Sequence, residues 1–127
     1  MIYGIGTDIV SLARIREVLA RHGARFAERV LADCEKAGFA SAHDPARFLA
    51  KRFAAKEAFS KALGTGLRPP ATLAAIGVGH DELGKPEYVC APALAQLLQA
   101  RGLRAQLSIS DERDYVLAFA IMEKVNE

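Results

Sequence analysis

Four charged residues, Asp8, Glu57, Lys61 and Lys85, have the types and surroundings expected of a site that handles phosphate. Asp8 lies in an apolar stretch, where a carboxylate is costly unless it is paired, hydrogen-bonded or bound to a cation. Glu57 is flanked by alanines, and Lys61 and Lys85 lie near glycines. Proteins hold Mg²⁺ through one or two carboxylates, phosphate oxygens and water, and lysines offset the charge on a leaving phosphate. The set therefore indicates a magnesium–pyrophosphate site, provided that the fold brings Asp8 to Glu57.

The same residues also have ordinary structural interpretations. Thr7 or Asp8 could begin a turn, and Glu57 and Lys61, four residues apart, could form an exposed ion pair on a helix. If the carboxylates do hold a metal, a nucleotide hydrolase and a group transferase fit the residues equally well. The residues alone leave these alternatives open.

A central helix, predicted over residues 48–63, must position the second carboxylate and the first lysine. Pro45 suits the first turn of a helix, and Gly64 suits a left-handed C-terminal cap. Apolar residues occur nearly all round this helix, and such helices are usually buried. Arg52 and Lys56 lie at the edge of the helix face that is lined by apolar side chains. Each of these two cations would therefore need a partner.

A strand, predicted over residues 2–10, must position Asp8, and Ile2, Ile5 and Ile9 are its core candidates. Its two glycines are typical of a bend or of the close approach of another backbone. The other predicted elements are a helix near 33–39, strands over 73–79 and 87–90, a helix over 92–101, and strands over 104–110 and 115–122. The last strand is apolar on both faces, so we expect the central helix to cover one face and a neighbouring subunit the other. The fold class is α+β, an antiparallel sheet packed against a long central helix.

A line of arginines lies on a helix that is predicted to end at Gly23. Arg14 and Arg21 are seven residues apart and share one edge of this helix, and Arg25 would continue the line if the helix crossed Gly23. Residues 14–29 contain five arginines against two glutamates, a local charge of +3. This segment is a candidate docking strip for an acidic protein partner, and a solvated helix face is the alternative.

Length and composition favour a single domain spanning residues 1–127. The chain is 51% hydrophobic and 25% charged, and it is long enough for one core but too short for two. No apolar run approaches the ~20 residues of a membrane span, and no signal-peptide pattern follows Met1, so we expect a cytoplasmic protein that does not enter the membrane. The net charge of +2 is too small to indicate nucleic-acid binding. Cys34 and Cys90 lack the spacing of a disulfide framework or a zinc site.

The sequence closely resembles the holo-(acyl carrier protein) synthases, which are small trimeric 4′-phosphopantetheinyl transferases. The resemblance spans nearly the whole chain. The motifs that carry it are, in order, Ile5-Gly-Thr-Asp-Ile9, Arg52-Phe-Ala-Ala-Lys-Glu-Ala-Phe-Ser-Lys61, Gly64-Thr-Gly66, Leu83-Gly-Lys-Pro86 and Ser108-Ile-Ser110. The second motif is very specific to this family, particularly with a Gly-Thr-Asp upstream.

The resemblance implies a reaction and roles for the charged residues. The reaction is transfer of phosphopantetheine from coenzyme A to a serine of apo acyl carrier protein, which releases adenosine 3′,5′-bisphosphate and serves fatty acid biosynthesis. By this match Asp8 and Glu57 hold Mg²⁺, and Lys61 contacts the phosphates and assists the departing bisphosphate. Glu57 is also implied to take the serine proton, directly or through a metal-associated water. A carrier-binding module without catalysis is the alternative, but it would not need these three residues.

The resemblance also implies binding residues and a homotrimer with its active sites at subunit boundaries. The nucleotide contacts are expected from Arg52, Lys61, Gly64, Thr65, Gly66, Lys85 and Pro86, and the contacts to the acidic helix of the carrier from Arg14, Arg21 and Arg25. One departure concerns Asp111, because many relatives have a histidine there. If that histidine holds the 3′-phosphate, Asp111 cannot replace it. Either another basic group, such as Arg52, then supplies the contact, or the loop turns Asp111 outward.

Overall fold

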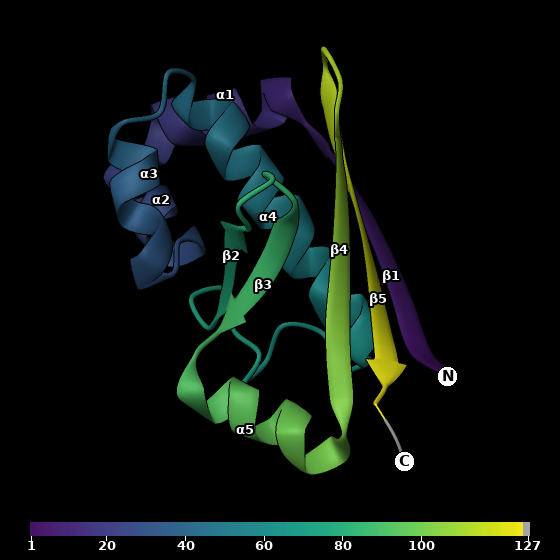
Figure 1. Ribbon diagram of the computed structural model, residues 1–127. Coiled ribbons are helices and arrows are strands. Elements are labelled where there is room, and N and C mark those ends of the chain that lie inside the picture. The colour runs from purple at the N-terminus through teal and green to yellow at the C-terminus, as the bar shows by residue number, and fades with distance from the viewer. Residues whose placement is uncertain (126–127) are drawn as a thin grey trace.

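The computed structural model describes residues 1–125 and has the predicted α+β fold, with antiparallel strands and a long central helix (Figure 1). The elements are β1 (Ile2–Ser11), α1 (Leu12–His22), α2 (Ala24–Val30), a 3₁₀ helix η1 (Asp33–Glu35), α3 (Lys36–Ala40), α4 (Pro45–Leu63), β2 (Ile76–His80), β3 (Pro86–Cys90), α5 (Pro92–Arg101), β4 (Leu103–Asp111) and β5 (Tyr115–Lys124). No helix within residues 1–125 is long and apolar enough to cross a membrane.

The strands form two antiparallel groups around α4. A three-stranded sheet has the order β1-β5-β4, and β2 and β3 form a separate hairpin. Helix α4 packs against β1 and β5 and also contacts β2, while α1, α2 and α3 gather at its N-terminal end and α5 lies toward the other end (Figure 1). The helix therefore sits at the centre of the fold, as the sequence predicts.

Helix α4 begins three residues earlier than predicted, at Pro45, because Asp44 caps it. The Asp44 side chain accepts a hydrogen bond from the Arg47 backbone N–H, and Pro45 occupies the first turn. Gly64 ends the helix with φ of 90°, a left-handed conformation that favours glycine. Twelve of its 19 residues are buried, which confirms that the helix is apolar nearly all round because it is enclosed.

Strand β1 runs unbroken through Asp8, so the alternative of a turn at Thr7 or Asp8 is wrong. Its glycines allow it to lie directly on α4. A Cβ added at Gly6 would meet the Ala58 carbonyl oxygen and would lie 2.7 Å from the Ala62 nitrogen, far inside normal contact. The prediction that glycines mark the close approach of another backbone is thus confirmed at Gly6.

The prediction that Ile2, Ile5 and Ile9 belong to the core is wrong. Ile5 and Ile9 are 59% and 63% exposed because they alternate along β1 with Gly6 and Val10, which face the core. Ile2 is 61% exposed at the start of the strand, where the pairing with β5 is irregular. On β5 the inward residues Val116, Ala118, Ala120 and Met122 are fully buried against the core. The central helix therefore covers one face of residues 115–122, as predicted. The other face carries an exposed apolar patch, the outer face, made by Ile5, Ile9, Tyr115, Leu117 and Phe119.

The segment after α1 differs from the prediction. Gly23 adopts φ of 54° and ends α1, so the helix does not cross it, and α2 starts a separate helix that the sequence did not predict. The helix predicted near residues 33–39 is present as η1 followed by α3. Arg25 therefore lies on α2 and does not continue the α1 line.

Candidate active site

Asp8, Glu57 and Lys61 lie together where β1 crosses α4. The Lys61 ammonium donates to the Thr7 carbonyl oxygen at 2.9 Å and to Asp8 Oδ1 at 3.2 Å. The Asp8 side chain is 18% exposed and the Lys61 side chain 51%, so the cluster opens to solvent from the lysine side. The close approach at Gly6 makes this arrangement possible, because any larger residue there would hold the strand away from the helix.

Glu57 interacts electrostatically with both neighbours. Burial raises the pKa of Glu57, the negative charge of Asp8 raises it further, and Lys61 lowers it. The two carboxylates are therefore close enough to repel each other, and together with one lysine they leave a net negative charge. No group of three or more His, Cys, Asp or Glu side chains that could hold a metal occurs within residues 1–125. A pair of carboxylates fits Mg²⁺, which takes its remaining ligands from phosphate and water.

Lys85 and Pro86 lie on the β2–β3 hairpin, away from this cluster within one chain. The loop is tied by Asp81, whose carboxylate accepts from the backbone N–H of Lys85. The Lys85 ammonium lies 3.5 Å from Gln106 Oε1 on β4, and Pro86 is the first residue of β3. The structure therefore does not bring Lys85 to Asp8.

The Gly64-Thr65-Gly66 loop continues from the end of α4. The N–H groups of Gly64 and Gly66 both donate to the Ser60 carbonyl oxygen, at 3.0 and 3.3 Å. The Thr65 hydroxyl donates to the Gly66 carbonyl oxygen at 2.9 Å. Both glycine N–H groups are thus used to cap the helix, so any contact of this loop with a phosphate would need other donors.

Arg52 is buried next to Glu35, separate from the carboxylate cluster. Its Nε lies 3.5 Å from Glu35 Oε2, and its guanidinium stacks over the Phe48 ring at 4.0 Å. Within residues 1–125 this Nε has no hydrogen-bond partner. Burial lowers the pKa of Arg52, and the charge of Glu35 opposes that shift.

Sequence reasoning missed Glu35, which is the partner of both buried cations. The fully buried Lys56 ammonium donates to Glu35 Oε1 at 2.6 Å, to the Leu73 carbonyl oxygen at 2.9 Å and to the Val30 carbonyl oxygen. Glu35 also accepts from the Val78 N–H at 2.9 Å. The available signal was that Lys56 lay at the edge of an apolar arc and needed a partner. The sequence around Glu35 has only a weak pattern of apolar and polar residues, so Glu35 could not be identified as that partner.

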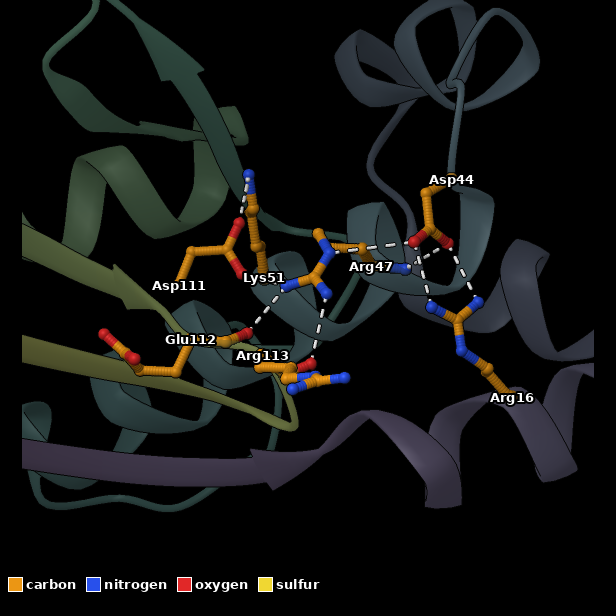
Figure 2. A network of polar contacts seen from close by, with 7 residues as sticks. All are labelled: Arg16, Asp44, Arg47, Lys51, Asp111, Glu112 and Arg113. Carbon is orange, nitrogen blue, oxygen red and sulfur yellow. Dashed lines mark hydrogen bonds and ion pairs between the residues drawn. The ribbon is translucent and has the colours of Figure 1, made fainter.

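Asp111 faces α4, where it pairs with two cations (Figure 2). Its carboxylate accepts from Arg47 and lies 3.1 Å from the Lys51 ammonium. Burial acts to raise the pKa of Asp111, but hydrogen bonds from Lys51 and Arg47 outweigh it and lower the pKa. The expected repulsion of a phosphate by Asp111 is therefore offset by two neighbouring positive charges.

The docking arginines are divided between two helices. Arg14 is exposed on α1, and the Arg21 side chain is 70% exposed with its guanidinium 3.9 Å from Glu17. Arg25 lies on α2 and lines a cavity of about 270 Å³ together with His22, Phe26 and Arg29. The three predicted residues therefore do not lie on one continuous helix.

Comparison with known proteins identifies the class to which this fold and site belong. The model of the 4′-phosphopantetheinyl transferase superfamily matches residues 4–120. A holo-[acyl-carrier-protein] synthase from Aromatoleum aromaticum is 64% identical over 98% of this chain and 99% of its own length. The chain belongs to the 4′-phosphopantetheinyl transferase superfamily and, within it, to the holo-[acyl-carrier-protein] synthases, and it is an enzyme of that class.

Two solved structures show the same fold. A holo-[acyl-carrier-protein] synthase from Neisseria meningitidis is 54% identical, has a TM-score of 0.94, and matches 98% of this chain and 100% of its own. A synthase from Bacillus anthracis in complex with CoA (3′,5′-ADP) is 34% identical with a TM-score of 0.82, and the match covers 98% of both chains. The recognition made from the motifs is therefore confirmed, and so is the fold.

Proposed function

We propose that this synthase transfers 4′-phosphopantetheine from coenzyme A to a serine of apo acyl carrier protein, with Mg²⁺, and so supplies holo carrier protein for fatty acid biosynthesis. The observation that carries the proposal is the cluster of Asp8, Glu57 and Lys61 in a chain that is 64% identical to a holo-[acyl-carrier-protein] synthase. The cluster combines hard oxygen ligands with a cation, as transfer from a pyrophosphate requires.

Asp8 and Glu57 would hold the Mg²⁺. The fit rests on the donor set, two neighbouring carboxylates with the Lys61 ammonium 3.2 Å from Asp8 Oδ1. Burial raises the pKa of Glu57, and the charge of Asp8 raises it further. When bound, the ion would offset the negative charge of the pyrophosphate oxygens. Neither carboxylate needs to move far from its position, because the β1 and α4 backbones are in contact at Gly6.

The transfer itself exchanges one phosphorus–oxygen bond for another. The serine oxygen of the carrier forms a bond to the phosphorus that bears pantetheine, and the bond from that phosphorus to the bridging oxygen breaks. Adenosine 3′,5′-bisphosphate leaves with the bonding electron pair. Glu57 accepts the serine proton, directly or through a water associated with the metal. Lys61 stabilises the charge that develops on the departing bisphosphate.

The nucleotide contacts require residues outside the carboxylate cluster. We place Arg52, Lys85, Pro86 and the loop Gly64-Thr65-Gly66 along the coenzyme A path, with Lys61 at its phosphates. Within one chain Lys85 lies apart from Asp8, which fits a site assembled between subunits of a homotrimer. The exposed apolar outer face supports such an assembly, because patches of this kind usually mark an interface.

The acyl carrier protein would dock on Arg14 and Arg21 of α1 and on Arg25 of α2. These exposed arginines would attract the acidic surface of the carrier and direct its approach. We also propose that residues 1–127 form a single domain and that it acts in the cytoplasm. The two free cysteines, Cys34 and Cys90, are compatible with such a reducing compartment.

Intact-mass spectrometry of apo acyl carrier protein, incubated with this enzyme, coenzyme A and Mg²⁺, tests the proposal. The expected result is a gain of one phosphopantetheinyl group that disappears with EDTA and in Glu57→Gln. Release of free phosphopantetheine without any gain on the carrier would indicate a hydrolase instead. Carrier binding without either product would indicate a non-catalytic module.

A further inference from the structure

A continuous polar network joins α1 to the β4–β5 turn across the N-terminus of α4 (Figure 2). Arg16 of α1 donates to both carboxylate oxygens of Asp44, at 3.0 and 2.9 Å. Asp44 also caps α4, and its carboxylate lies 3.6 Å from the Arg47 Nε. Asp44 thus contacts α1 and α4 at the same time.

The second half of the network runs from Arg47 to the turn. The Arg47 guanidinium donates to Asp111 and to the Glu112 carbonyl oxygen at 2.8 Å, and to the Arg113 carbonyl oxygen at 3.2 Å. Lys51, one helical turn along α4, pairs with the same Asp111. The turn is therefore held by one side-chain carboxylate and two backbone carbonyls.

The network lies next to the point where β1, which carries Asp8, is followed by α1, which carries Arg14 and Arg21. Strand β1 ends at Ser11, opposite Tyr115 of β5, and α1 begins at the next residue. The Leu12 N–H donates to the Asp114 carbonyl oxygen at 2.9 Å, so the first residue of α1 is hydrogen-bonded to the same β4–β5 turn. Asp8 lies three residues before the end of this strand. A shift of the turn would therefore move α1 relative to Asp8.

Arg16 faces away from the docking arginines. Arg16 is two residues from Arg14, about 200° around the helix, whereas Arg21 is nearly in line with Arg14. Arg16 therefore holds the back of α1 while Arg14 and Arg21 point outward. Single exposed ion pairs contribute little, but a bidentate arginine–carboxylate pair within a network is the geometry in which they matter. The pKa of Asp44 falls to about 2, first because of its hydrogen bond with Arg16, which shows how firmly the charged form is held.

We propose that Asp44 and Asp111 are positioning residues for carrier docking: through Arg16 and Arg47 they fix the orientation of α1 relative to the carboxylates that perform the transfer. The inference rests on the proposed docking of the carrier on Arg14 and Arg21. In this arrangement Arg16 holds α1 in place through Asp44 and does not contact the carrier itself.

Charge makes the proposal sharply testable, because the two carboxylates are acidic and so is the proposed partner. If Asp44 acted only through its charge, Asp44→Asn would remove a repulsion and strengthen carrier binding. If it positions α1, the same change weakens carrier binding. Asparagine also caps helices well, so α4 keeps its start. Asp111→Asn makes the same charge change at the other end of the network.

The experiment measures the KM for apo acyl carrier protein and the KM for coenzyme A in the full-length enzyme. We expect Asp44→Asn and Asp111→Asn each to raise the carrier KM about threefold or more, and Asp44→Asn to leave the coenzyme A KM unchanged. Glu17→Gln is the matched control, because Glu17 lies on α1 outside the network and the substitution also removes one negative charge. It should leave the carrier KM unchanged or lower it. Thermal melts verify that each variant is folded.

A carrier KM that is unchanged or lower in Asp44→Asn and Asp111→Asn, as expected for the control, would overturn the inference. An equal rise in the carrier KM and the coenzyme A KM of Asp44→Asn would also overturn it. Arg14→Glu, measured alongside, separates this failure from failure of the docking proposal. If Arg14→Glu raises the carrier KM while the two network variants do not, only the positioning role is wrong. If Arg14→Glu has no effect, the docking proposal fails and the inference fails with it.

Discussion

Replacing Gly6 by alanine should push β1 away from α4 and separate Asp8 from Glu57. The new Cβ would lie 2.7 Å from the Ala62 nitrogen and 2.8 Å from the Lys61 Cβ, whereas ordinary contacts begin at 3.4 Å. The strand must therefore retreat by at least about 0.7 Å (3.4 − 2.7). Most of the atoms in the way belong to the helix backbone, which cannot rotate aside.

The expected cost has two parts. Overpacking should reduce the free energy of unfolding by about 1–3 kcal/mol. Misplacing a catalytic group by about 1 Å can cost about 100-fold in rate, so kcat should fall by up to about that factor. The Mg²⁺ concentration that gives half-maximal rate should also rise, because the two carboxylates would no longer share one ion.

The assay is the rate of holo carrier formation against Mg²⁺ concentration, with thermal melts of the same samples. Gly79→Ala is the matched control, because its Cβ would meet only the flexible Val89 Cγ2 at 3.3 Å and it lies on the β2–β3 hairpin. A Gly6→Ala enzyme that keeps both its rate and its Mg²⁺ dependence would show that the close approach at Gly6 does not position the two carboxylates.

The charged residues lead to four further predictions. Because burial and Asp8 raise the pKa of Glu57 in the metal-free enzyme, its carboxyl takes up a proton at a higher pH than an ordinary glutamate. Protons should therefore compete with Mg²⁺, and kcat/KM at sub-saturating Mg²⁺ should fall as pH is lowered through that raised value. The same shift means that ionised Glu57 destabilises the folded state above the ordinary glutamate pKa, so Glu57→Gln should raise Tm at neutral pH in metal-free buffer, although kcat falls by about 100-fold or more. Lys56→Ala should lower the free energy of unfolding by about 3–5 kcal/mol in denaturant titrations, because Glu35 would be left buried without its closest cation. Arg14→Glu should raise the carrier KM much more than the coenzyme A KM, and an equal change in both would contradict its docking role.

The main parts of the site could be predicted because they violate local rules. A carboxylate in an apolar strand and a helix without a solvent face both require a special environment, so Asp8 and Glu57 stood out. Gly6 signalled the close approach that joins them. The C-terminal ends of α1 and α4 were predictable from Gly23 and Gly64, whose effects on the backbone are local.

What failed depended on contacts distant in sequence. Isoleucine is usually a core residue, so Ile5 and Ile9 were assigned to the core. Only the position of α4 shows that the other face of β1 is the buried one. Glu35 could not be matched to Lys56, because nothing local links positions 21 residues apart. Asp111 was expected either to leave the phosphate contact to another basic group or to turn outward. Its pairing with Arg47 depends on the packing of a hairpin that is 64 residues away from that arginine.

Binding of Mn²⁺ as a paramagnetic substitute for Mg²⁺, followed by electron paramagnetic resonance in the presence of coenzyme A, shows whether Asp8 and Glu57 hold one metal ion together against the pyrophosphate. We expect tight binding of one ion per chain that is lost in both Asp8→Asn and Glu57→Gln while both proteins remain folded. Unchanged Mn²⁺ binding in either variant would contradict it.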